Sequence, residues 1–82
     1  MPVVLTLGGV RVTIYTNDHR PAHVYAKGAG REAVFNLNCP VGPVELRENY
    51  GFSHAALNKL AKQLQAQLDV LCPEWRDLHG NY

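Results

Sequence analysis

The first half of the chain alternates apolar and polar positions, as β-strands do, and two glycines separate its first two apolar runs. Residues 3–7 (VVLTL) and 10–16 (VRVTIYT) flank Gly8 and Gly9, which can adopt the positive φ angles of a two-residue hairpin turn. With Leu7 opposite Val10, side-chain alternation places six apolar residues on one face of the hairpin. The facing pairs are Leu7–Val10, Leu5–Val12 and Val3–Ile14.

Two further strands follow after a polar turn. Residues 23–26 (HVYA) and 31–37 (REAVFNL) have strand-like composition and flank the glycine turn KGAG. Residues 44–48 (VELRE) form at most a short edge segment. The pattern therefore predicts a four-stranded, mostly antiparallel sheet that begins with a β-hairpin.

The second half has helical periodicity. Ser53 is a good N-cap, and Phe52 and Leu57 have the spacing of a hydrophobic staple. An apolar stripe follows at Leu57, Leu60, Ala61, Leu64, Leu68 and Leu71. Pro73 disfavours continuing the helix, and Gly80 can end a last short turn. We expect one long C-terminal helix packed on one face of the sheet, in a single small α+β domain over residues 1–82.

Composition and charge limit the classes of function. Apolar residues make up 46% of the 82 positions and charged residues 18%, values typical of a globular protein. Eight basic residues offset seven acidic ones, for a net charge of +1. We therefore do not expect binding to nucleic acid mainly through phosphate contacts, while a local basic patch that binds RNA stays open. So short a chain also buries little surface alone, which favours a partner protein or a homodimer.

The cysteines and the absence of long apolar runs bear on location. Cys39 and Cys72 fit no zinc or redox motif, and we expect two free thiols in a reducing cytosol rather than a disulfide. The first residues lack the pattern of a secretory signal, so we expect none, and no apolar run reaches the roughly 18 residues of a membrane span. The expected location is cytoplasmic, without membrane contact.

Polar side chains collect on the face of the sheet that the helix leaves open. Arg11 and Tyr15 come from the second strand, and His23 and Tyr25 come from the third. A histidine or tyrosine can act as general base or acid, and an arginine can stabilise a phosphorane. These four are candidate catalytic residues for metal-independent RNA cleavage, and Asn36 joins them as a binding residue. The alternative is that these residues form a solvent-exposed face of the sheet without catalytic function, stabilised by cross-strand pairs.

The turn TNDHRPAHVY (residues 16–25) offers a second set of candidates. His19 and His23 are good metal ligands, and Asp18 could supply an oxygen. The two histidines do not share a helix, however, and no fourth ligand is evident. We therefore expect no metal and no cofactor, and retain His19 and Asp18 as binding residues.

Two features of the second half can be structural or functional. Trp75 follows the Pro73 break and either caps the core or stays partly exposed as an anchor for another chain. The stretch ENYGFS (residues 48–53) supplies a turn, a staple and a cap, and Glu48 or Asn49 could also reach a site.

Several of these stretches together resemble a known family. YTNDHRPAHVY, GREAVFNL, VELRENYGFS and a leucine-rich helix with a late tryptophan are similar, in this order, to the small bacterial domain of unknown function numbered 4160. Ala22 stands where the family usually has a second proline, and Tyr25 stands where it has a further histidine. The resemblance implies a partner encoded by a neighbouring gene, in a suggested toxin–antitoxin pair.

Two hypotheses result. The chain is a partner-binding module, with Trp75 or the open sheet face as contact surface. Alternatively, it is a ribonuclease-type toxin that uses His23, Arg11 and Tyr25.

Overall fold

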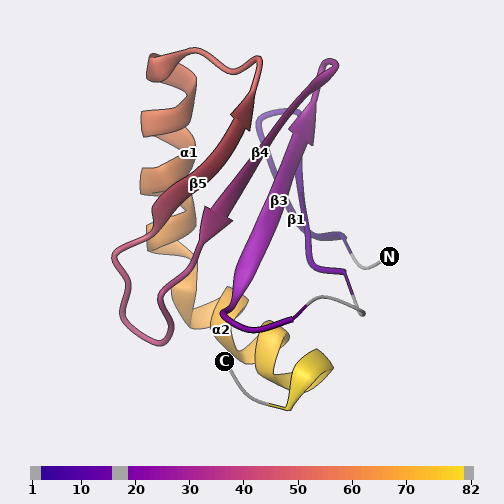
Figure 1. Cartoon of the computed structure of the whole chain (residues 1–82), viewed down its shortest axis with the longest axis vertical. Helices are drawn as coiled ribbons and strands as arrows, with labels where there is room; N and C mark the ends of the chain where they lie inside the picture. The colour runs from indigo at the N-terminus through magenta and orange to yellow at the C-terminus, as the bar shows by residue number, and fades with distance from the viewer. Residues whose placement is uncertain (1–2, 16–18, 81–82) are drawn as a thin grey trace.

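The fold is a five-stranded sheet with two helices on one face. The structure, a computed structural model, describes residues 3–15 and 19–80. The elements in chain order are β1 (Val3–Leu7), β2 (Val10–Thr13), β3 (His23–Gly28), β4 (Arg31–Asn36), β5 (Glu45–Tyr50), α1 (His54–Ala66) and α2 (Leu68–His79). The α+β class expected from the sequence is confirmed (Figure 1).

The strands form an antiparallel meander in the order β1-β2-β3-β4-β5. The predicted hairpin register is confirmed at its turn, where Leu7 lies opposite Val10 and Leu5 lies opposite Val12. The predicted pair Val3–Ile14 is wrong, because a register shift between Val3 and Leu5 places Val3 opposite Thr13. A bulge of this kind changes the face on which the following residues lie.

The number of strands was underestimated. Glu45–Tyr50 is a complete edge strand of six residues, β5, paired antiparallel with β4, and all six residues are exposed. Because both faces of β5 are exposed to solvent, its sequence has no alternation of apolar and polar residues that would predict a strand. The sheet therefore has five strands instead of four.

The expected single helix is divided into two. Ser53 caps α1 as predicted, and its Oγ accepts a hydrogen bond from the Ala56 amide at 3.2 Å. The division falls at Gln67, and Pro73 lies inside α2, so the predicted break at Pro73 is wrong. Residues on both sides of the proline, Cys72 and Trp75 among them, are buried, and this packing offsets the hydrogen bond that a proline removes from a helix.

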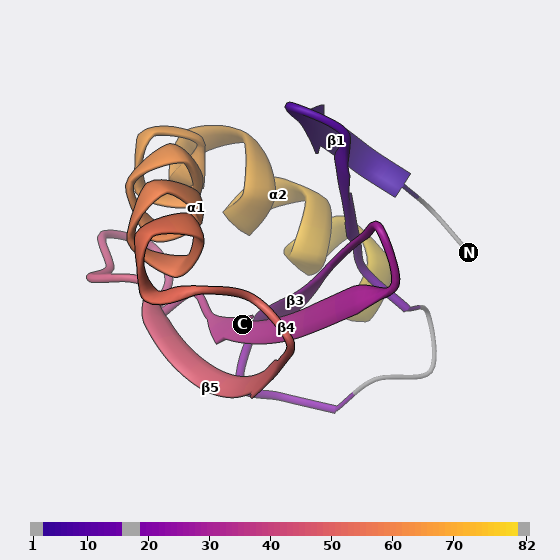
Figure 2. The ribbon, with the colours of Figure 1, turned by 90° about the horizontal axis from the view of Figure 1, so that it is seen from above.

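One face of the sheet and the apolar stripes of the helices form the core. Figure 2 shows both helices on the same side of the curved sheet. Val24, Ala26, Ala33 and Phe35 are at most 1% exposed, and they share one cluster with the buried leucines of α1 and α2. Among the described residues no helix is both long and apolar enough to cross a membrane.

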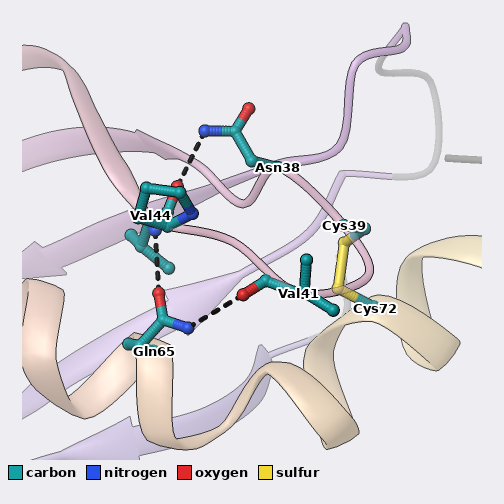
Figure 3. Close-up of a disulfide and its surroundings, with 7 residues drawn as sticks. Asn38, Cys39, Val41, Val44, Gln65 and Cys72 are labelled. Carbon is teal, nitrogen blue, oxygen red and sulfur yellow. Dashed lines mark hydrogen bonds between the residues drawn. A yellow bond between two sulfur atoms is a disulfide. The ribbon is translucent and has the colours of Figure 1, made fainter.

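The cysteines are bonded to each other. The expectation of two free thiols is wrong, since the sulfur atoms of Cys39 and Cys72 lie 2.06 Å apart in a disulfide (Figure 3). The bond ties the loop between β4 and β5 to α2. Gln65 of α1 holds the same loop, accepting a hydrogen bond from the Val44 amide and donating one to the Val41 carbonyl.

Candidate active site

A polar cavity lies at the start of β3, on the face of the sheet away from α1. We name it the His23 cavity; its volume is about 220 Å³. The lining residues are His19, Arg20, Pro21, His23, Tyr25, Arg47 and Glu48. They come from the segment before β3, from β3 itself and from β5. Val34 of β4 lies in register between Tyr25 and Glu48 and is only 3% exposed, so the cavity bridges three neighbouring strands.

His23 forms a buried part of this cavity. It is 5% exposed, and its ring centroid lies 5.1 Å from that of Trp75 on α2. The expectation that His23 stands in water, away from the helical segment, is therefore wrong. Its Nδ1 lies 2.8 Å from the Pro21 carbonyl oxygen. Because a carbonyl only accepts, Nδ1 carries the hydrogen of this bond, and in the neutral ring Nε2 is then the nitrogen with the lone pair.

His23 belongs to a group of five aromatic side chains that we name the ring cluster, made up of Tyr15, His23, Tyr25, Trp75 and His79. Successive ring centroids are 4.8 Å apart for Tyr15 and Tyr25, 5.6 Å for Tyr25 and His23, and 3.9 Å for Trp75 and His79. Edge-to-face and stacked pairs at these distances are favourable. The cluster therefore fixes His23 and Tyr25 from the side of α2.

His79 joins the end of α2 to the end of β2. Its Nδ1 lies 3.2 Å from the Trp75 carbonyl oxygen, and its Nε2 lies 3.1 Å from the Tyr15 carbonyl oxygen. Both partners are acceptors, so an imidazolium makes both bonds whereas a neutral ring donates only one. A positive charge also suits the C-terminus of a helix.

The structure brings together three of the four predicted catalytic residues and leaves Arg11 elsewhere. Arg11 lies opposite Lys27, four residues along β3 from His23, which corresponds to about 13 Å at the rise of a strand. The expectation that Arg11 acts beside His23 is therefore wrong. The cation at Tyr15 is Lys27, whose Nζ donates a hydrogen bond to the Tyr15 hydroxyl at 2.5 Å. This bond raises the pKa of Lys27.

Two arginines that the sequence reasoning missed line the cavity instead. Arg20 lies within the TNDHRPAHVY turn, and Arg47 lies in β5. Both stand in the stretches that carry the family resemblance, and that position is the only sequence signal that could have singled them out. With Glu48, they bring two guanidinium groups and one carboxylate to the cavity.

The β5 side of the cavity is exposed and polar. Arg47 Nε lies 4.0 Å from a carboxylate oxygen of Glu48. The other oxygen of Glu48 accepts a hydrogen bond from the Tyr50 hydroxyl at 2.5 Å, and this bond raises the pKa of Tyr50. Glu48 is therefore held in place by two neighbours on its own strand.

The remaining predicted binding residues are distributed differently. His19 is exposed and lines the cavity, while Asp18 lies outside the described residues. Asn36 lies opposite His23 in register, and its buried Oδ1 has no hydrogen-bond partner within the described part of the chain. Trp75 is fully buried, so it caps the core, and the alternative of an exposed anchor is wrong. Over residues 3–15 and 19–80, no three His, Cys, Asp or Glu side chains gather in a group that could hold a metal ion.

Comparisons with known proteins identify the family. No curated protein and no solved structure gave a significant match to the chain. A family model described as a domain of unknown function (DUF4160) matches residues 9–76, which include β2 to β5, α1 and most of α2 as well as every residue that lines the His23 cavity. The resemblance noted in the sequence is confirmed, and the chain belongs to the DUF4160 family.

Proposed function

We propose that the chain cleaves single-stranded RNA, without a metal ion, at the His23 cavity. The observation that carries the proposal is a single cavity of about 220 Å³ on which the described residues bring together two imidazoles, two guanidinium groups, a phenol and one carboxylate. Proton donors and acceptors beside paired cations are what phosphodiester cleavage requires. A cavity bounded by the sheet suits a single strand, whose bases can be turned outward, better than a duplex.

The reaction is an attack of the ribose 2′-hydroxyl on the adjacent phosphorus. His23 Nε2 removes the 2′-hydroxyl proton, the 2′-oxygen–phosphorus bond forms, and the phosphorus–5′-oxygen bond breaks. His19 gives a proton to the departing 5′-oxygen. Arg20 and Arg47 hold the non-bridging oxygens as charge develops on the phosphorane. The products are a 2′,3′-cyclic phosphate and a 5′-hydroxyl end.

The test uses purified protein and a labelled single-stranded RNA in the presence of a chelator. We expect cleavage to cyclic phosphate ends, and no cleavage of an RNA whose attacking 2′-hydroxyls are replaced by hydrogen. His23→Asn is the informative variant, because its amide nitrogen can keep the donor to Pro21 while the Nε2 function is lost. We expect this change to lower the rate by about 100-fold or more.

Two arginine variants test whether cleavage depends on the cavity or on positive charge elsewhere on the sheet. Arg47→Gln should slow cleavage, whereas Arg11→Gln removes another exposed arginine that does not line the cavity and should leave the rate unchanged. RNA that stays intact at high protein concentration contradicts the proposal. So does a cleavage activity that His23→Asn and Arg47→Gln retain in full, since it would come from a contaminant.

The second candidate function is a partner-binding module, within a two-gene toxin–antitoxin system. The observation in its favour is β5, an edge strand with all six residues exposed, including Leu46 at 47% and Tyr50 at 60%. An open edge strand can pair with a strand of another chain. The candidate partners are the product of a neighbouring gene or a second copy of this chain.

Co-expression with the neighbouring gene product, followed by light scattering on the purified material, tests this second candidate. A stable complex that Leu46→Lys disrupts, formed by a chain that leaves RNA intact, would favour partner binding alone. A monomer that captures nothing would contradict it. A cytoplasmic location belongs to both proposals, and there the Cys39–Cys72 bond would meet a reducing pool of thiols.

A further inference from the structure

A second cavity lies at the opposite end of the sheet from the His23 cavity. Its volume is about 340 Å³. It is bounded by the β1–β2 turn, the β3–β4 turn and one side of α1, and its lining residues are Leu7, Gly8, Gly9, Val10, Gly28, Ala29, Arg31, Phe52, Ala56, Lys59, Leu60 and Gln63. His23 and Gly28 are the two ends of β3, so about 17 Å of strand separates the two cavities.

The floor of this second cavity is apolar. Its apolar residues are Leu7, Val10, Phe52, Ala56 and Leu60, and all are buried or half-buried. Small-molecule sites are typically concave, mostly apolar and at least about 300 Å³ in volume. The cavity meets the lower end of that range, so it suits a small ligand.

The two hairpin turns are packed closely, which defines the cavity mouth. A Cβ atom placed on Gly28 would lie 3.0 Å from the Gly9 carbonyl oxygen and 3.3 Å from the Val10 Cα. Contacts of this length are tighter than nearly all side chains tolerate. A larger residue at position 28 would have to displace the first turn by a few tenths of an ångström, and the glycine leaves the mouth without a side chain there.

The charged groups that line this cavity in the described part of the chain are positive. Arg31 and Lys59 line it, and both are exposed; no carboxylate is among its lining residues in the described part of the chain. Arg31 belongs to β4 and Lys59 to α1, so the two cations reach the cavity from different elements. An anionic head group between them would complement both charges.

We propose that this cavity binds a small amphipathic anion, with an apolar chain on the floor and a carboxylate between Arg31 and Lys59. The inference is independent of RNA cleavage, because none of the described residues lines both cavities. The apolar floor supplies burial, and the two cations supply orientation and preference for an acid over its neutral analogue.

The experiment is an amide NMR titration with octanoate, with octanol as the uncharged analogue. We expect octanoate to shift the amide signals of Gly9, Gly28 and Leu60, and octanol to bind more weakly. Lys59→Glu should weaken octanoate binding by about fivefold or more. Lys62→Glu makes the same charge change on the same helix at an exposed residue that does not line the cavity, and it should have a much smaller effect.

A substitution that fills the cavity tests the role of its apolar residues without changing the charge. Ala56→Leu adds volume at a helical position on the cavity wall and should abolish binding, while a circular dichroism spectrum checks that the fold is kept. Octanoate that shifts no cavity amide overturns the proposal. Equal binding of octanoate and octanol overturns it too, as does an equal loss from Lys59→Glu and Lys62→Glu.

Discussion

The two walls of the His23 cavity are built in opposite ways. The wall at β3 is buried: His23 is 5% exposed, Trp75 behind it is fully buried, and the ring cluster and the Pro21 carbonyl hold His23 in place. The wall at β5 is an exposed edge strand, where Glu48 contacts Arg47 and accepts a hydrogen bond from Tyr50.

This difference in burial implies that the β3 wall contributes to the stability of the fold, whereas the β5 wall contributes only to the chemistry of the cavity. A buried aromatic residue contributes several kcal/mol to folding, whereas an exposed ion pair contributes little. The β3 wall is thus part of the core and is fixed before any ligand arrives, while the β5 wall can be altered without cost to the fold. Substitutions in the first wall should change stability and any activity together, and substitutions in the second should change activity alone.

The largest effect is expected from Trp75→Ala. The side chain is fully buried between the core and His23, so its removal should lower the free energy of unfolding by about 3–5 kcal/mol. Trp75→Phe is the matched control. The indole Nε1 has no hydrogen-bond partner among the described residues, so the phenyl ring loses volume but no such bond and should cost much less. Urea denaturation followed by circular dichroism measures both, and equal losses would show that the buried wall is not packed as described.

The next largest effect concerns the disulfide that connects the two walls. Cys39 precedes β5 and Cys72 lies in α2, with a sequence separation of 33 (Figure 3). Closing a loop of this length restricts the unfolded chain by about 3–4 kcal/mol. The double variant Cys39→Ser and Cys72→Ser should therefore unfold at markedly lower urea concentration than the oxidised chain. Treating the oxidised chain with dithiothreitol should reproduce most of the loss, and an unchanged midpoint in both experiments would refute the expectation.

The sequence predicted the parts of this arrangement that depend on neighbouring residues. The Gly8–Gly9 turn sets the pairs Leu7–Val10 and Leu5–Val12, and Ser53 caps α1 through its own first turn. Local pattern could not predict contacts between distant segments. His23 and Trp75 are 52 positions apart in the sequence, and Cys39 and Cys72 carry no motif that pairs them.

The fifth strand and the division of the helix were not predicted, because local sequence pattern marks neither of them. The strand β5 is wet on both faces, so apolar alternation could not reveal it. The division between α1 and α2 falls at Gln67, where neither glycine nor proline marks it. Of the residues that line the cavity, the sequence analysis named His19, His23, Tyr25 and Glu48, whereas Arg20 and Arg47 became apparent only once the strands were placed side by side.

A smaller effect is expected from His79→Ala, at the edge of the buried wall. The change removes the bonds to the Trp75 and Tyr15 carbonyls and the stacking on Trp75. Hydrogen bonds of this kind contribute about 1 kcal/mol each, so the free energy of unfolding should fall by about 1–2 kcal/mol. His54→Ala is the control, because His54 is exposed at the first residue of α1. Equal midpoints for the two variants would show that His79 does not join α2 to β2.

The smallest effect on stability is expected from Arg47→Gln, in the exposed wall. Arg47 is exposed on an edge strand and lies 4.0 Å from Glu48, so the free energy of unfolding should change by no more than about 0.5 kcal/mol. If the exposed wall contributes to chemistry and not to stability, this variant should still cleave RNA more slowly, because the guanidinium group that it removes lines the cavity. Urea denaturation and the cleavage assay on the same preparation check both halves of the expectation. A variant that is strongly destabilised would mean that β5 is part of the structural core. A variant with full stability and full cleavage would mean that the exposed wall takes no part in the chemistry, which would then depend on the segment 19–25 alone.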